Sequence, residues 1–175
     1  VIKIVIAGVG TVGTGLLELL KIFKKKKYKI EITHIASRRN LKKLNKSFPN
    51  SKIFKDARSL LDESEYDILV ELIGGEDGIA KELVFDALKK KKNVVTANKA
   101  LVSKYWQDII KLTLTNGCKL KYEAAVAGGI PIIKVIEEFL ISNKIKKIYG
   151  ILNGTSNYIL SRMLSSNSEF NSILK

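Results

Sequence analysis

The stretch IVIAGVGTVG at residues 4–13 constrains the fold of this chain more than any other part of the sequence. An apolar run leads into closely spaced glycines, and leucines with the spacing of a helix follow. A strand, a glycine turn and a helix in that order are typical of a dinucleotide-binding site. Gly8 permits the tight turn, Gly10 lets the backbone approach a pyrophosphate, and Gly13 lets the helix pack close to the strand. The free N–H groups and the positive dipole end of that helix favour phosphate.

The composition is that of a packed globular chain. Hydrophobic residues make up 46% of the 175 residues, which argues against disorder. No run of about 18 uncharged apolar residues is present, so we expect no membrane span. The first strand begins at once, so we expect no signal peptide. Cys118 and His34 are the single cysteine and histidine, which excludes a disulfide framework and a cysteine–histidine zinc site within the chain. We therefore expect a cytoplasmic setting.

The net charge of +14 raises nucleic acid as a partner. The lysine clusters, however, fall at expected helix ends and loops, and no aromatic residues are interleaved with them as stacking platforms. These clusters are at 24–27, 42–43, 89–92 and 144–147. We expect a solvated, lysine-rich surface that attracts anionic metabolites. We do not expect it to bind nucleic acid, and specific nucleic-acid binding is the alternative interpretation.

Strands and helices alternate through the first two thirds of the chain. The predicted strands are at 30–37, 52–54, 67–73, 93–96 and 119–122. Helices are predicted to follow Asp56, to span 80–91 and to surround Trp106, whereas 41–50 is expected to be a polar connection. This alternation with short joins predicts an α/β fold with a Rossmann-type, doubly wound parallel sheet, formed by a dinucleotide-binding domain over residues 1–122.

The pattern changes at residue 123. A glycine-rich segment is followed by a predicted amphipathic helix at 131–141, a strand at 145–152 and a helix at 158–164. Residues 123–175 are therefore expected to begin a second, mixed α/β domain that is incomplete here.

The residues after the second strand bear on the choice of cofactor. NAD sites usually have a carboxylate about 20 residues after the glycines, which accepts hydrogen bonds from the ribose hydroxyls. Residues 33–39 contain no acid, and Ser37, Arg38 and Arg39 stand there instead. Because an arginine pairs with a 2′-phosphate through its forked guanidinium, this favours NADP; exposed arginines at a strand end are also common, so NAD remains the alternative.

Four motifs make the chain similar to homoserine dehydrogenases. They are ELIGG at 71–75, TANKAL at 96–101, YEAAVAGGIP at 122–131 and GILNGTSNYIL at 150–160. The resemblance implies reduction of aspartate 4-semialdehyde to homoserine with a nicotinamide cofactor, on the route to threonine, methionine and isoleucine. It also implies a small-molecule substrate, and a homodimer for the full-length protein.

The resemblance also implies roles for particular residues. Lys99 would lie near nicotinamide and substrate and assist proton transfer or stabilise charge, because hydride arriving at an aldehyde carbon leaves negative charge on its oxygen. With the glycines of the turn and the arginine after the second strand, the full set expected to bind the cofactor is Gly8, Gly10, Thr11, Val12, Gly13, Arg38, Ile73, Gly74 and Lys99. Those implied to hold a monovalent cation, expected to be Na⁺, are Glu123, Val126, Gly128 and Ile130. Those implied beside the substrate are Asn153, Gly154 and Thr155.

Two other readings remain open. Family members have a further carboxylate-and-lysine set downstream, and this chain ends before it. The second reading is therefore that the chain is a nucleotide-binding module that does not catalyse turnover on its own. The third reading is another semialdehyde or hydroxy-acid dehydrogenase with a similar nucleotide domain.

Overall fold

The computed structural model describes residues 1–23, 29–150 and 153–173. It divides into two compact units, Val1–Ala125 and Val126–Lys175. Among the described residues, no helix is both long and apolar enough to cross a membrane. The lysines at 24–27, which were predicted to fall at a helix end or in a loop, lie outside the described residues.

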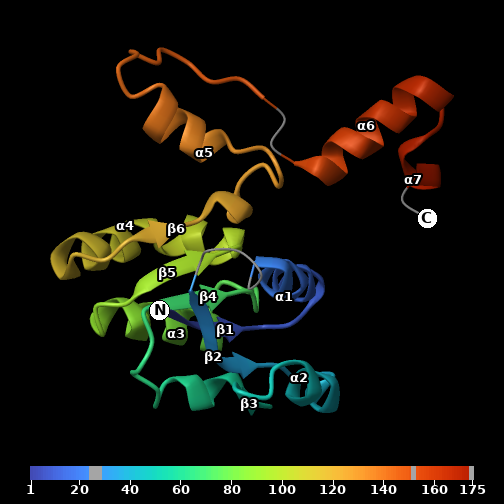
Figure 1. Cartoon of the computed structure of the whole chain (residues 1–175). Coiled ribbons are helices and arrows are strands. Elements are labelled where there is room, and N and C mark those ends of the chain that lie inside the picture. The colour runs from blue at the N-terminus through green and yellow to red at the C-terminus, as the bar shows by residue number, and fades with distance from the viewer. Residues whose placement is uncertain (24–28, 151–152, 174–175) are drawn as a thin grey trace. The chain divides into compact units, whose positions relative to one another are not determined.

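The first unit alternates strands and helices. Its strands are β1 (Ile2–Ala7), β2 (Ile30–Ala36), β3 (Lys52–Phe54), β4 (Ile68–Glu71), β5 (Asn93–Thr96) and β6 (Leu120–Lys121). Its helices are α1 (Thr11–Phe23), α2 (Leu41–Ser47), α3 (Ile79–Lys89) and α4 (Lys99–Asn116), with the 3₁₀ turns η1 (Ala57–Leu60) and η2 (Glu123–Ala125). The strands form one sheet in the order β3-β2-β1-β4-β5-β6, and every neighbouring pair is parallel. The Rossmann-type sheet predicted from the sequence is confirmed (Figure 1).

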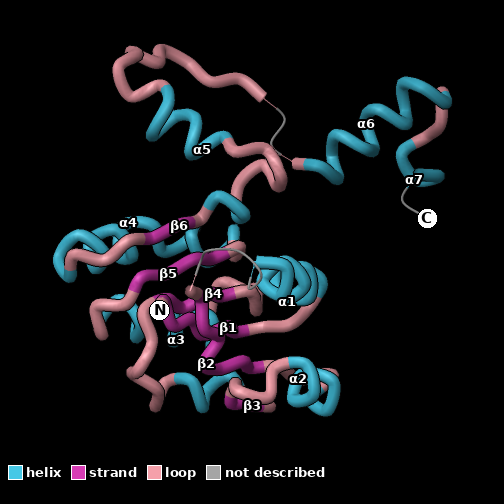
Figure 2. The backbone as a smooth tube through the Cα atoms, in the orientation of Figure 1, coloured by secondary structure: helices cyan, strands magenta, loops and turns pink. Residues whose placement is uncertain are grey.

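The strand order reverses between β1 and β4. From β1 the chain moves outward to β2 and β3, and it then returns to β4 and moves outward the other way. Right-handed crossovers in opposite directions place α1 and α2 on one face and α3 and α4 on the other (Figure 2). The carboxyl ends of β1 and β4 are therefore left open beside each other, which is where open α/β sheets bind ligands.

Two apolar layers hold this arrangement together, one on each face of the sheet. Alternate residues of β1 divide between them, because successive side chains of a strand point to opposite faces. The layer beneath α1 and α2 contains Ile4, Ile6, Leu17, Ile32, Ile35, Leu44, Phe48 and Val70. The layer beneath α3 and α4 includes Val5, Ala7, Leu69, Leu83, Val84, Leu88, Val94, Leu101 and Ile109. A sheet buried on both faces explains why its central strands are nearly continuous apolar runs.

His34 is part of the structural core. It is buried in β2, its ring stacks on Phe54, and its Nε2 lies 3.2 Å from a Glu63 carboxylate oxygen. Burial lowers the pKa of His34 below its ordinary value of 6.5, against the opposing effect of Glu63. Across the described residues, no group of three or more histidine, cysteine, aspartate or glutamate side chains is placed to hold a metal ion.

Two local predictions are wrong. Residues 41–47 form helix α2, although 41–50 was expected to be a polar connection. Its apolar contact comes from Leu44 in the helix and Phe48 directly after it, and this pair is too short to show a helical period in the sequence. The strand predicted at 145–152 is absent from 145–150, where Ile145 and Ile148 are exposed, and 151–152 lie outside the described residues.

The second unit is helical in its described residues. It contains α5 (Ile132–Lys134), the π-helical segment η3 (Val135–Phe139), α6 (Gly154–Ser166) and α7 (Phe170–Ile173). The helix predicted at 131–141 is thus shorter, and it consists of an α-helical turn followed by a π-helical segment. The helix predicted at 158–164 begins four residues earlier. It begins there because the Asn153 side chain accepts a hydrogen bond from the Ser156 N–H and caps α6.

Candidate functional site: a pocket at the carboxyl edge of the sheet

The turn between β1 and α1 is built around two glycines that tolerate no side chain. Gly8 has a φ of +103°, and a Cβ there would lie 2.6 Å from the Leu72 carbonyl oxygen. A Cβ on Gly13 would lie 2.3 Å from the Gly8 carbonyl oxygen. At Gly10, by contrast, a Cβ would meet nothing within 4 Å. Gly8 and Gly13 therefore make the turn tight, whereas Gly10 leaves an open approach to the backbone.

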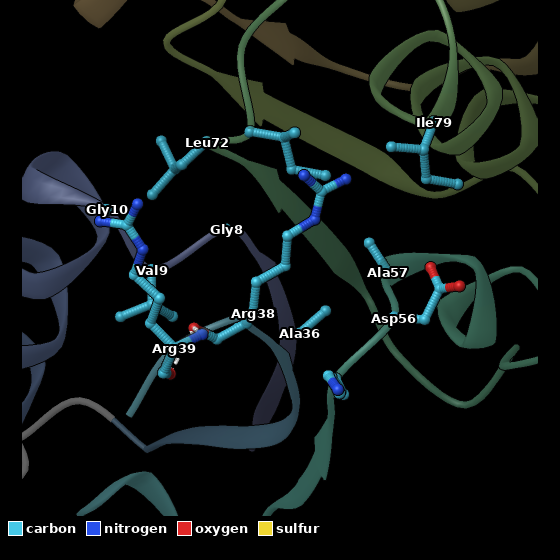
Figure 3. Close-up of a pocket in the computed structure, with 13 residues that line it drawn as sticks. Gly8, Val9, Gly10, Ala36, Arg38, Arg39, Asp56, Ala57, Leu72 and Ile79 are labelled. Carbon is cyan, nitrogen blue, oxygen red and sulfur yellow. Dashed lines mark hydrogen bonds between the residues drawn. The ribbon is translucent and has the colours of Figure 1, made fainter. Parts of the chain in front are cut away.

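A pocket of about 300 Å³ opens directly beside this turn (Figure 3). Its walls come from the ends of β1, β2, β3 and β4, so it lies at the carboxyl edge of the sheet. The lining residues are Gly8, Val9, Gly10, Ala36, Ser37, Arg38, Arg39, Lys55, Asp56, Ala57, Leu72, Ile73 and Ile79. A glycine turn that leads into the N-terminus of a helix fits a pyrophosphate, because the N–H groups of the first turn of α1 have no partners within the helix.

The β2 and β3 side of the pocket is cationic. In Figure 3 the side chains of Arg38 and Arg39 extend from the end of β2 over the pocket. The turn that carries them is fixed by Ser37, whose hydroxyl donates to the Arg39 carbonyl oxygen at 2.8 Å. Lys55 follows β3 in the same wall. Asp56 is the acid among the lining residues, and its carboxylate accepts the Arg58 N–H at 2.9 Å as the cap of η1.

The opposite side of the pocket is formed by the loop that follows β4, and the loop that follows β5 is hydrogen-bonded to that loop. Ile73 lines the pocket, and the Gly74 N–H donates to a Glu71 carboxylate oxygen at 3.2 Å. Lys99 is the first residue of α4 and is exposed. Asn98 caps α4 through its side-chain oxygen, which accepts the Leu101 N–H at 3.2 Å. The cap fixes where α4 begins and hence where Lys99 stands.

The structure brings part of the predicted cofactor set together. Gly8, Gly10, Arg38 and Ile73 line one pocket. Thr11, Val12 and Gly13 form the first turn of α1, and Gly74 and Lys99 lie in the loop after β4 and at the start of α4. Sequence reasoning placed Arg39 beside Arg38 in the cofactor argument but assigned no site role to Lys55 or Glu71. Lys55 directly follows a predicted strand, and the shared edge of parallel strand ends was the signal available for it.

The residues implied for substrate and cation binding fall mostly in the second unit. Asn153 is the cap of α6, and Gly154 and Thr155 are the first residues of that helix. Glu123 belongs to η2 in the first unit, whereas Val126, Gly128 and Ile130 belong to the second. Gly128 has a φ of +61°, and the Ile130 N–H donates to the Ala127 carbonyl oxygen at 3.2 Å. Their binding roles stay predictions.

Three features together define a dinucleotide-binding domain of the Rossmann type: a parallel sheet whose strand order reverses at its centre, a glycine turn without room for side chains, and a pocket at the switch point. Residues 8–123 match the family described as homoserine dehydrogenase, NAD binding domain, and residues 131–175 match the family described as homoserine dehydrogenase. The chain belongs to the homoserine dehydrogenase family, and its first unit is a nicotinamide-dinucleotide-binding domain.

Relatives and solved structures agree with this assignment. The chain is 35% identical to homoserine dehydrogenase of Bacillus subtilis and 40% identical to that of Neisseria gonorrhoeae, in each case over 99% of this chain and 41% of the relative. A homoserine dehydrogenase crystal structure from Thiobacillus denitrificans matches with a TM-score of 0.88 at 40% identity, over 99% of this chain and 41% of that one. The structure of the Staphylococcus aureus protein at pH 7.5 matches with a TM-score of 0.76 at 34% identity, over 98% and 40%. The chain spans about two fifths of the length of these relatives.

The glycine turn generates a first prediction. Gly13→Ala forces a methyl group against the Gly8 carbonyl oxygen, so we expect a loss of about 1–3 kcal/mol in the free energy of unfolding and loss of nicotinamide-dinucleotide binding. Gly15→Ala is the matched control, because a Cβ there meets nothing within 4 Å and alanine favours the helix. Thermal unfolding and a fluorescence titration with NADPH measure both effects. Equal behaviour of the two variants would contradict the packing described here.

Proposed function

We propose that this chain supplies the cofactor-binding part of an enzyme that interconverts L-aspartate 4-semialdehyde and L-homoserine with NADPH. The observation that carries the proposal is the pocket at the switch point, with the glycine turn on one side and Arg38, Arg39 and Lys55 on another. Membership of the homoserine dehydrogenase family supports the substrate. The relatives that bear this name are more than twice as long as this chain, so the reaction belongs to a longer protein.

Preference for NADPH over NADH follows from the charges at the end of β2. A dinucleotide with its pyrophosphate on the Gly8 turn places its adenosine ribose over β2, where NAD sites usually have a carboxylate. Arg38 and Arg39 stand there, and Lys55 adds a third cation. Asp56, the acid nearby, is engaged as the cap of η1. Three cations suit a 2′-phosphate, because hydrogen bonds between ionised partners are about twice as strong as neutral ones.

Lys99 is proposed as the catalytic residue of this chain. When bound, the reduced nicotinamide supplies the hydride that converts the aldehyde carbon to an alcohol carbon. The carbonyl oxygen gains negative charge as its double bond is lost, and it then takes up a proton. An ammonium group stabilises that charge as it develops. Lys99 is suited to this role because the Asn98 cap and the end of β5 fix its backbone beside the loop that follows β4.

Further features of the longer protein stay predictions. Glu123, Val126, Gly128 and Ile130 are proposed to hold Na⁺, since a carboxylate and carbonyl oxygens suit a hard cation. Asn153, Gly154 and Thr155 are proposed to lie beside the substrate. A homodimer, a cytoplasmic location and the absence of nucleic-acid binding rest on the sequence alone.

The cofactor preference is tested by charge removal at the pocket. We expect Arg38→Ala and Lys55→Ala each to weaken NADPH binding about tenfold, with NADH binding changed less than about twofold, because only NADPH carries the 2′-phosphate. Arg58→Ala is the matched control, since Arg58 is exposed on η1 and does not line the pocket. Isothermal titration of each variant with both cofactors gives the two affinities. Equal losses for NADPH and NADH would contradict the assignment of the 2′-phosphate site.

The reaction is tested by following NADPH absorbance after aspartate 4-semialdehyde is added to the full-length enzyme. We expect NADPH consumption, and a loss of about a hundredfold or more in kcat for Lys99→Met measured at saturating NADPH. Lys111→Met, which removes an exposed lysine further along α4, should match the unmodified enzyme. A folded protein that binds NADPH but consumes none would contradict the proposed reaction and leave a nucleotide-binding module.

A further inference from the structure

A carboxylate is buried beneath the part of the site where the nicotinamide is expected. Glu71 ends β4 and has none of its surface exposed. One of its oxygens accepts the N–H groups of Ile73 at 2.8 Å and Gly74 at 3.2 Å, and the other accepts the Thr96 hydroxyl at 2.5 Å. Among the described residues no cation pairs with it, so hydrogen bonds alone compensate the cost of burying this carboxylate.

The bonds from Glu71 belong to a closed ring that joins two loops. The Thr96 hydroxyl also accepts the Asn98 N–H at 2.9 Å, and the Asn98 side-chain amide donates to the Gly75 carbonyl oxygen at 2.6 Å. The ring runs from Glu71 through Thr96 and Asn98 to Gly75, and returns through the loop at 73–75. Thr96 is 1% exposed and Asn98 is 5% exposed, so water does not compete for these bonds. The loop after β4 and the start of α4 are thereby fixed to each other.

Glu71 joins the loop after β4 to the end of β5 through its side chain, as Asn98 joins that loop to the start of α4. Its two oxygens serve separate groups, the loop at 73–74 and the β5 hydroxyl. A glutamine keeps the shape but replaces one accepting oxygen by an NH₂ group, which can only donate. With the glutamine oxygen on the Ile73 and Gly74 N–H groups, its NH₂ group faces the Thr96 oxygen, and the Thr96 O–H loses the carboxylate oxygen to which it donates in the unmodified chain. The substitution therefore leaves at least one bond mismatched.

The position of the ring assigns it to one half of the cofactor. In the proposed function the adenosine half lies over β2. Because the dinucleotide crosses the switch point, its nicotinamide half then lies over the ends of β4 and β5. That is where the loop at 73–75 and Lys99 stand. We infer that Glu71 is a positioning residue for the nicotinamide end of the site, which holds the loop after β4 and the Lys99 backbone at a fixed separation.

The inference rests on the proposed function and is tested with two ligands. NADPH occupies both halves of the site, whereas 2′,5′-ADP occupies only the adenosine half. For Glu71→Gln we expect NADPH affinity to fall about tenfold, the scale of one mismatched buried hydrogen bond, while 2′,5′-ADP affinity stays within about twofold. Isothermal titration of the chain below the unfolding temperature of each variant measures both.

Thr96 provides the matched pair of variants. Thr96→Ser keeps the hydroxyl and should bind both ligands as the unmodified chain does, whereas Thr96→Val removes it and should lose NADPH selectively. The double variant Glu71→Gln/Thr96→Val should lose less than the product of the single losses, because both changes break the same bond. A purely packing role would not separate serine from valine in this way.

The outcomes distinguish this inference from the function on which it rests. If the unmodified chain binds neither NADPH nor 2′,5′-ADP, the proposed function fails. If it binds both, and Glu71→Gln weakens both equally or neither, the positioning role is overturned while the cofactor site stands. Selective loss of NADPH binding in Glu71→Gln and Thr96→Val, with NADPH binding retained in Thr96→Ser, is the result that supports it.

Discussion

The closure of the turn at Gly8 is the contact on which the rest of the site depends. The Gly8 carbonyl oxygen approaches Gly13 so closely that no Cβ fits between them, and Gly8 itself lies against the Leu72 backbone. These contacts tie the start of α1 to the ends of β1 and β4. Because of them the N-terminus of α1 faces the switch point, and a helix N-terminus with unpaired N–H groups favours an anion.

The parallel sheet then collects residues that are far apart in the sequence. Arg38 follows β2, Lys55 follows β3, Ile73 follows β4 and Lys99 follows β5, and all of these strand ends share one edge of the sheet. Cations gather at the β2 and β3 end, whereas buried hydrogen bonds organise the β4 and β5 end. In the proposed binding mode, a dinucleotide that crosses this edge meets charge at its adenosine half and a hydrogen-bonded pair of loops at its nicotinamide half.

The sequence predicted the sheet well because buried parallel strands leave a strong local signal. The strand at 93–96 has the predicted bounds, and β4 lies within the predicted 67–73. Helix α2 was missed because most of its residues are polar and Leu44 is its buried one. The strand predicted at 145–152 failed over 145–150 because a β-branched pattern forms a strand only where another strand pairs with it, and the described part of the second unit contains none. The position of Lys55 directly after a predicted strand was a usable signal, whereas the bonds that Glu71 makes with Ile73 and Thr96 are not visible from sequence spacing.

The central claim is that a nicotinamide dinucleotide lies across the switch point between β1 and β4. Backbone amide chemical shifts of the chain, recorded by NMR during a titration with NADPH, test it most directly. We expect the largest changes to fall on residues 8–13, on Arg38 and Arg39, and on Ile73 and Gly74. Changes concentrated instead around the polar pocket lined by Lys3, Glu31 and Glu65, away from the glycine turn, would contradict it.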